Sequence, residues 1–260
     1  MINPDFIRLV EQAAGVLARE PLRLHVLPEG CPVVYIGDTH GDSDATRRIF
    51  ARFPPDRYIL VFLGDYVDRG PDSLGNVRLL LAEKLAHPDR VVLLMGNHEG
   101  WKVAPFQPAD FWHGLPTETA ELLGRTFLQL PLAAWHPLGV LAVHGGLPEV
   151  GSLEAFGDIE NGDANWRNVT WGDWQEDGTP ESPWDSRPSL DHKMFERISA
   201  RLGAKVLVRS HQPFAPTYLY EDRCLTVFTS CAYGDGHRQV AILRPHQCIR
   251  SAKDLDVIDV

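Results

Sequence analysis

The sequence predicts an α/β fold built on two β-sheets. Five short apolar runs, typical of buried strands, are spread along the chain at residues 33–36, 58–63, 91–95, 140–143 and 206–208. Segments with helical apolar spacing separate the first three runs. This order indicates a β-α-β-α-β succession with right-handed crossovers and a largely parallel sheet. Two later runs, 224–229 and 239–243, are closely spaced, and we expect them to form a second, antiparallel-leaning sheet that faces the first.

Helices are expected wherever apolar residues recur every three or four positions. The segments with this spacing are residues 4–19, 42–53, 72–86, 117–129 and 190–202. Proline or a polar turn follows most of them, for example Pro21 after the first. Asp42 and its neighbours resemble a helix start, and Thr117 is the expected N-cap of the fourth helix.

The domain organisation follows from length and composition. A chain of 260 residues with 44% hydrophobic residues can bury a large core, and we predict a single domain over 1–260. A loop-rich insertion is expected at about 151–189, where tryptophans alternate with Asp, Gly and Pro. Its expected role is a self-packed surface loop, and a lid that shapes the substrate site is the alternative.

Charge, hydropathy and cysteine spacing exclude several protein classes. The formal net charge of −10 argues against nucleic acid or an anionic membrane as the main partner. No apolar run approaches eighteen residues and the first residues do not form a signal peptide, so we expect a soluble, cytoplasmic protein. The four cysteines lie far apart without a C-x-x-C pair, which predicts free thiols rather than a disulfide framework or zinc knuckle.

Polar side chains follow each of the five apolar runs directly. Strand ends are where open α/β sheets place their ligands. Asp38 and His40 are two residues apart, so on an extended segment both side chains point to the same side and can reach one ion. The residues that follow the other four runs are Asp65, Asn97 with His98, His144, and His211. Five strands that each end in Asp, Asn or His indicate a metal site.

Five short blocks occur in a specific order along the chain. They are Gly-Asp-Thr-His-Gly at 37–41, Gly-Asp-Tyr-Val-Asp-Arg-Gly at 64–70, Gly-Asn-His-Glu at 96–99, His-Gly-Gly at 144–146 and Arg-Ser-His-Gln at 209–212. Together they resemble the metal-dependent serine/threonine phosphoprotein phosphatases of the calcineurin-like metallophosphoesterase superfamily. The resemblance extends from about Val33 to Leu243. It implies a sandwich of two mixed sheets flanked by helices, in α-β-β-α layers.

The resemblance also implies a centre of two divalent metal ions. Asp38, His40 and Asp65 would bind the first ion, and Asp65, Asn97, His144 and His211 the second, with Asp65 as the bridge. Such a pair of ions shares a hydroxide that attacks phosphorus in line. Manganese is expected, or iron with zinc or manganese, because mixed nitrogen and oxygen ligands do not choose uniquely among these metals.

The same resemblance assigns roles beyond the metal ligands. His98 matches the general acid that protonates the leaving seryl or threonyl oxygen, and Asp68 matches the carboxylate that orients it and raises its pKa. The expected phosphate-binding residues are Arg69, Arg187, Asn97 and Tyr233. The setting of Arg187, Asp-Ser-Arg-Pro, departs from the family's usual Arg-Gly context.

Two alternatives to a protein phosphatase acting on phosphoproteins remain open. For the phosphatase itself a stand-alone enzyme is expected, because the late loop at 229–236 is shorter than in the eukaryotic family and no regulatory subunit is indicated.

The first alternative is a symmetric diadenosine tetraphosphate hydrolase. Such an enzyme shares the metal core and the Arg-Gly-Pro-Asp-Ser-Leu stretch at 69–74, but Asp68 and Glu99 favour the phosphatases. A non-catalytic phosphate-binding scaffold is disfavoured because all the expected ligands and His98 are present.

Overall fold

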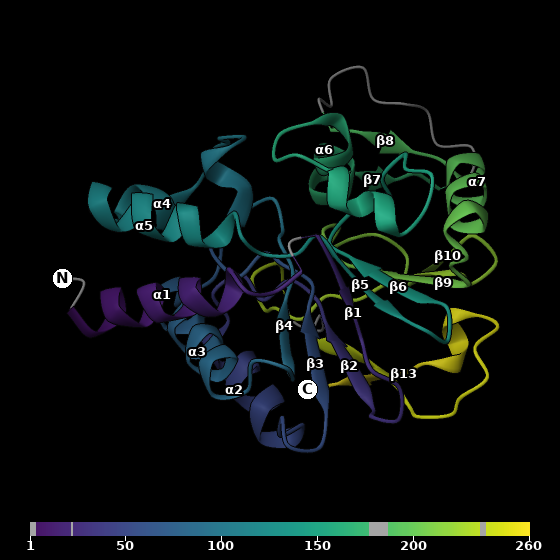
Figure 1. The fold of residues 1–260 in the computed structure, drawn as a ribbon, viewed down its shortest axis with the longest axis horizontal. Coiled ribbons are helices and arrows are strands. Elements are labelled where there is room, and N and C mark those ends of the chain that lie inside the picture. Colours follow the sequence, from purple (N-terminus) through teal and green to yellow (C-terminus); the bar gives the residue numbers. More distant parts are fainter. Residues whose placement is uncertain (1–3, 22, 177–186, 235–237) are drawn as a thin grey trace.

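The computed structural model describes residues 4–21, 23–176, 187–234 and 238–260. Two sheets pack face to face, and helices cover their outer sides (Figure 1). Within the described residues the helices are α1 (Pro4–Leu17), α2 (Ser43–Arg52), α3 (Ser73–Ala86), α4 (Asp110–Gly114), α5 (Thr117–Phe127), α6 (Ala164–Trp171) and α7 (His192–Leu202), with 3₁₀ turns η1 (Glu99–Lys102), η2 (Glu154–Asp158) and η3 (Ala252–Asp254). The predicted α/β fold of two mixed sheets with flanking helices is confirmed.

The first sheet has five strands in the order β13-β12-β2-β3-β4. The strands are β2 (Val33–Ile36), β3 (Ile59–Phe62), β4 (Val91–Leu93), β12 (Gln239–Leu243) and β13 (Asp256–Asp259). β2, β3 and β4 run parallel, and α2 and α3 connect them as the sequence predicted. All their side chains are buried on both faces, which explains why these strands appear as unbroken apolar runs.

The second sheet has six strands in the order β1-β5-β6-β9-β11-β10. The strands are β1 (Leu24–Val26), β5 (Ala133–His136), β6 (Val140–Val143), β9 (Val206–Arg209), β10 (Tyr218–Leu219) and β11 (Cys224–Thr226). β6, β9 and β11 run parallel. A separate two-stranded sheet pairs β7 (Asp173–Trp174) with β8 (Ser189–Leu190).

The expectation that the two late strands belong together in the second sheet was wrong. β11 joins that sheet beside β9, whereas β12 pairs with β2 in the first sheet. A short connection did not force the two strands to pair with each other. β10 covers the free side of β11, and β12 covers the side of β2 that would otherwise be an exposed edge.

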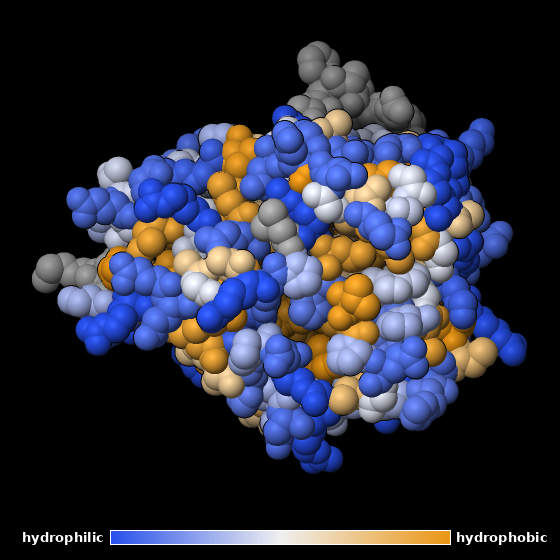
Figure 2. Space-filling view, viewed as in Figure 1, coloured by the Kyte–Doolittle hydropathy of each residue, from blue (hydrophilic) through white to orange (hydrophobic). Residues whose placement is uncertain are grey.

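The buried apolar side chains form two clusters, and successive residues of a strand contribute to them in alternation. Val33 and Tyr35 of β2 point into the space between the sheets, where they meet residues of the second sheet such as Val208. Val34 and Ile36 point outward, into the cluster that includes the helices. The resulting layers are α-β-β-α. Figure 2 shows that hydrophilic side chains cover most of the visible surface, with smaller apolar areas among them.

Helix starts depend on side-chain caps at two of the predicted positions. Asp42 accepts a hydrogen bond from Ala45 N at 3.1 Å, and Asp72 accepts one from Gly75 N at 2.9 Å. Thr117 is not an N-cap, because the helix already includes it and Pro116 precedes it. None of the helices in the described parts of the chain has the length and apolar character that a membrane span needs.

The segment from 151 to 189 contains more regular structure than a loop. Its described part includes η2, α6, β7 and the start of β8. Trp166 of α6 is fully buried and donates to Met95 Sδ at 3.2 Å, so this segment packs on the core. Residues 177–186, including Trp184, lie outside the described residues.

Candidate metal centre

The carboxyl ends of five strands from both sheets meet at one place. Asp38, Asp65 and Asn97 follow β2, β3 and β4, while His144 and His211 follow β6 and β9. All five residues are buried, with at most 6% of their surface exposed. The structure therefore brings together the residues that the sequence singled out, across sequence separations of up to 173 positions.

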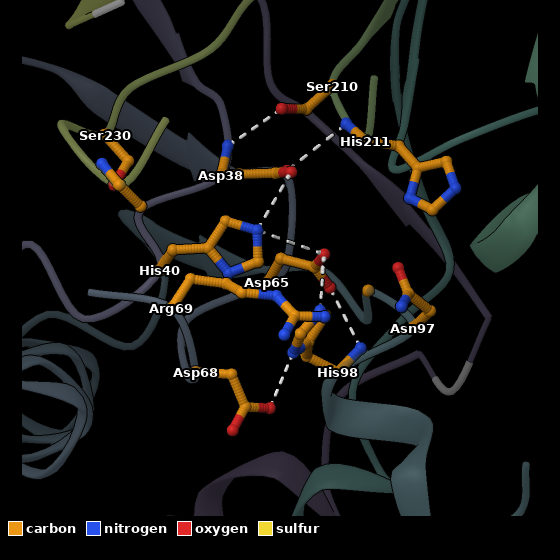
Figure 3. Close-up of polar contacts among 12 residues, drawn as sticks. Asp38, His40, Asp65, Asp68, Arg69, Asn97, His98, Ser210, His211 and Ser230 are labelled. Atoms are coloured by element: carbon orange, nitrogen blue, oxygen red, sulfur yellow. Dashed lines mark hydrogen bonds and ion pairs between the residues drawn. The ribbon is translucent and has the colours of Figure 1, made fainter. Parts of the chain in front are cut away.

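The carboxylate of Asp65 lies at the middle of this cluster (Figure 3). Its Oδ2 atom is 3.4 Å from His144 Nε2, 3.7 Å from His40 Nε2 and 3.8 Å from His98 Nε2. Two groups of three possible ligands share this residue: Asp65 with His40 and His98, and Asp65 with His144 and His211. In each group all ligand atoms lie within 4.8 Å of one another. Asp65 can thus contribute to two neighbouring ion positions.

Hydrogen bonds to backbone carbonyls fix which ring nitrogens face the cluster. His40 Nδ1 lies 2.9 Å from Val67 O, and His144 Nδ1 lies 2.9 Å from Leu63 O. A carbonyl only accepts, so each Nδ1 donates, and each Nε2 faces Asp65 and offers its lone pair to a cation once it has lost its proton. His144 Nε2 also lies 3.0 Å from His211 Nδ1 and 3.2 Å from Asn97 Oδ1. These nitrogen and oxygen atoms form a ligand set with its lone pairs directed inward.

The charges of the cluster fit a bound cation. Asp38 Oδ2 is buried and makes no hydrogen bond, although it lies 3.7 Å from His40 Nε2. Burial raises the pKa of Asp38 to about 7. Burial disfavours charged His144, but the carboxylates of Asp65 and Asp38 outweigh this and raise its pKa to about 9. A buried carboxylate oxygen without a donor and imidazoles at short distances from it are the environment that divalent cations stabilise.

His98 and Asp68 form a separate buried pair beside Asp65. His98 Nδ1 lies 2.6 Å from Asp68 Oδ2, and Asp68 Oδ1 accepts from Phe111 N at 2.8 Å. The backbone N–H of His98 donates to Asp65 Oδ1 at 2.9 Å. Burial opposes a charged His98, but Asp65 and Asp68 outweigh it and raise its pKa. The free Nε2 of this imidazole faces the cluster, 3.8 Å from Asp65 Oδ2.

The other predicted phosphate-binding residues lie around the same cluster. Arg69 follows Asp68, and its NH1 donates to Pro108 O at 3.0 Å. The ring of Tyr233 is 5.6 Å from that of His40, and Arg69 is close enough to oppose the rise in the Tyr233 pKa that burial causes. Arg187 NH1 is 3.5 Å from His211 Nε2.

Two carboxylates to which the sequence analysis assigned no role in the site support the ligands. Glu99 Oε2 accepts from Asp65 N at 2.7 Å and Gly96 N at 3.0 Å, and its Oε1 accepts from Tyr66 N at 2.8 Å. Burial and the Asp65 charge raise the pKa of Glu99 to about 7, against these N–H donors. Asp173 lies 3.5 Å from His211 Nε2. The Gly-Asn-His-Glu block already included Glu99, but Asp173 had no comparable signal.

The backbone of this site is unusual as well as its side chains. Nine non-glycine residues among those described have positive φ, and five of them belong to the site. These are His40, Asp65, Asp68, Arg69 and His211, with φ between 41° and 69°. Left-handed backbone at non-glycine residues costs energy and collects at functional sites, so this arrangement supports a ligand-binding role.

Comparison with known proteins identifies a family and similar proteins. The family model described as calcineurin-like phosphoesterase matches residues 31–215. The serine/threonine-protein phosphatase 6 catalytic subunit of Drosophila melanogaster is 30% identical over 241 residues, which covers 87% of this chain and 78% of that protein. A Saccharomyces cerevisiae serine/threonine phosphatase with similarity to human phosphatase PP5 has a TM-score of 0.81 at 22% identity, covering all of this chain and 90% of the other.

A putative diadenosine tetraphosphatase is also similar in structure. Its TM-score is 0.54 at 22% identity, with 85% of this chain and 92% of the other covered. At this identity the similarity shows a common fold and does not choose between activities. The family model covers most of the chain, and the structure places its strand-end residues around one buried cluster. The chain belongs to the calcineurin-like phosphoesterase family.

Proposed function

We propose that this chain is a protein phosphatase that hydrolyses phosphoserine and phosphothreonine in proteins with the help of two divalent metal ions. The observation that carries the proposal is the position of Asp65 Oδ2 within 3.4–3.8 Å of three imidazole nitrogens. The similarity to the Drosophila phosphatase 6 catalytic subunit over 87% of the chain supports the substrate class.

The proposed ligands divide into two sets that share Asp65. Asp38, His40 and Asp65 would hold one ion, and Asp65 with Asn97, His144 and His211 the other. When bound, a pair of divalent ions supplies an activated water at neutral pH and neutralises charge on the phosphoryl oxygens. Manganese, or iron with zinc or manganese, suits this mixture of imidazole, carboxylate and amide ligands.

His98 has the geometry of a proton donor. Its Nε2 atom is near enough to Asp65 to act as a ligand, but its Nδ1 bond of 2.6 Å goes to the Asp68 carboxylate, whereas His40 and His144 donate to backbone carbonyls. The Asp68 charge favours the protonated imidazolium of His98. A protonated ring cannot bind a metal, but it can donate from Nε2 to the leaving oxygen of serine or threonine. Asp68 fixes the ring orientation and stabilises its charge.

The phosphoryl group would lie between positive side chains on two sides. Arg69 and Tyr233 stand on the His40 side of the cluster, and Arg187 stands near His211. A planar guanidinium can donate two parallel hydrogen bonds to phosphoryl oxygens. Local positive charge of this kind is needed because the net charge of the chain is −10. Asn97, with its oxygen near His144, is proposed to contact both metal and substrate.

The proposal is tested by metal-dependent turnover of p-nitrophenyl phosphate and a phosphoserine peptide. Asp65→Asn should abolish turnover of both, and His98→Asn should lower kcat for the peptide by about 10²–10⁴. His246→Asn is the matched control, because His246 is exposed and its φ of 60° suits asparagine. Full activity in Asp65→Asn and His98→Asn would overturn the assigned roles.

A parallel assay with diadenosine tetraphosphate separates the alternative function. The symmetric hydrolase remains open because the chain shares its 69–74 stretch and its fold. We expect phosphopeptide turnover to exceed dinucleotide turnover. Hydrolysis of the dinucleotide alone would assign the chain to that class, and metal binding without any turnover would favour a scaffold role.

A further inference from the structure

Phe214 is an exposed aromatic side chain close to the candidate metal centre. It is 77% exposed, and among the described residues Val26, at 59%, is the one other exposed large apolar side chain. Covering an exposed Phe ring with another apolar group is favourable, so its position beside the candidate metal centre makes it a candidate contact for a substrate.

Ring contacts connect Phe214 to the metal centre. Its ring packs edge-on against Tyr233 with centroids 6.1 Å apart, and Tyr233 lies 5.6 Å from the ring of His40. These two steps together are no longer than about four residues of an extended peptide at ~3.3 Å each. A peptide whose phosphorylated residue occupies the metal centre can therefore place a neighbouring side chain on Phe214.

The loop that presents Phe214 is held in place on both sides. Pro213 and Pro216 restrict its backbone, and Ala215 N donates to Gln212 O at 3.2 Å. The side chain of Gln212 accepts from Trp174 N at 2.9 Å and donates to Trp174 O at 3.3 Å. An aromatic side chain on a rigid loop loses little conformational entropy when it binds.

We propose that Phe214 is a specificity-determining residue that binds an apolar side chain of the phosphoprotein, within about four residues of the phosphorylated one. The inference rests on the proposed phosphatase function and adds a substrate preference to it. The occupant is apolar because Phe214 offers no hydrogen bond, and contact with an apolar group removes the exposed part of its ring from water. It belongs to an extended peptide because the ring contacts from His40 through Tyr233 to Phe214 span a distance that a few extended residues cover.

The test compares two phosphoserine peptides that differ only in flanking residues. One carries leucine at the second and third positions on both sides of phosphoserine, and the other carries serine there. The wild type should have a kcat/KM about five- to tenfold higher for the leucine peptide, the range of a contact with one or two apolar groups. Phe214→Ser should reduce this ratio to about one, and Phe214→Leu should retain part of it.

The ratio of the two peptides removes any general loss of activity from the comparison. Val26→Ser is the matched control, since Val26 is at the end of β1. β1 runs parallel to β5 and β5 antiparallel to β6, so Val26 lies at the end of the sheet opposite His144. This variant should keep the wild-type ratio.

Three outcomes would overturn the inference, and one concerns the function instead. The inference would be wrong if the wild type had equal kcat/KM for both peptides, or if Phe214→Ser kept the wild-type preference. It would also be wrong if the wild type were a dimer that Phe214→Ser dissociates. The dimer would mean that a second copy covers the ring, and sedimentation velocity detects it. Turnover of p-nitrophenyl phosphate without turnover of either peptide would instead contradict the protein phosphatase proposal.

Discussion

Glu99→Gln tests whether the bridging carboxylate depends on its buried support. Glu99 accepts three backbone hydrogen bonds, two at Oε2 from Asp65 and Gly96 and one at Oε1 from Tyr66. Glutamine has nearly the same shape but only one oxygen. Its NH₂ group must therefore face at least one backbone N–H. Both groups are donors, so that buried N–H would have no acceptor.

The expected cost follows from these contacts. A buried N–H without an acceptor costs about 1–3 kcal/mol, and hydrogen bonds to a charged acceptor contribute about 1.5–3 kcal/mol. We expect Glu99→Gln to lower the free energy of unfolding by about 1–3 kcal/mol, the cost of the N–H without an acceptor, because burial and the Asp65 charge, which raise the Glu99 pKa to about 7, already offset the gain from a charged acceptor. Because the lost bond is at Asp65 itself or at Tyr66 directly after it, metal affinity should fall about 10- to 100-fold, as for other residues that orient ligands.

Urea unfolding and metal titration measure the two effects separately. Glu11→Gln is the matched control, because Glu11 is exposed on α1 and should shift neither quantity appreciably. If Glu99→Gln unfolded at the wild-type urea concentration and bound metal with wild-type affinity, the supporting role of Glu99 would be refuted.

Three further substitutions test neighbouring features. Gly96→Ala would place a Cβ 2.2 Å from Asp65 Oδ1 and 2.5 Å from Asp65 N, a steric clash that must displace Asp65. Metal affinity and turnover should therefore fall at least roughly tenfold, as measured by metal titration and p-nitrophenyl phosphate hydrolysis. Asp173→Asn removes the charge 3.5 Å from His211 Nε2, and we expect about tenfold weaker metal binding with unchanged unfolding. Asp72→Ala removes the N-cap of α3 and should lower unfolding free energy by about 1–2 kcal/mol in urea.

Each of these substitutions has a result that contradicts its reasoning. Wild-type metal affinity in Gly96→Ala would mean that the backbone there yields easily, and Gly157→Ala, with nothing within 4 Å of its Cβ, serves as control. Unchanged metal binding in Asp173→Asn would leave that carboxylate without influence on His211. Unfolding of Asp72→Ala at the wild-type urea concentration would show that α3 is held by packing alone.

The residues of the candidate site were predictable because they are local features of the chain. Each apolar run ends in a polar residue, and parallel strands bring such ends to one edge of a sheet. The step from Asp38 to His40 also needed only a short spacing, whereas the pairing of Asp68 with His98, thirty residues apart, came from the resemblance to the phosphatases. The metal-ligand and catalytic roles stay predictions until metal binding and turnover are measured.

The parts that escaped prediction depend on long-range packing. Nothing in the run 239–243 indicates that it pairs with β2 rather than with the strand that precedes it in the chain. β1 is only three residues long, too short for a periodic signal. Asp173 comes to His211 through the small β7–β8 sheet, and such a contact cannot be read from spacing.

Calorimetric titration of manganese into metal-free protein tests the central claim, the sharing of Asp65 by two ions, most directly. The wild type should bind two ions per chain, and Asp65→Asn should lose one site and weaken the other. Two sites of wild-type affinity in Asp65→Asn, or the absence of binding to the wild type, would contradict the account.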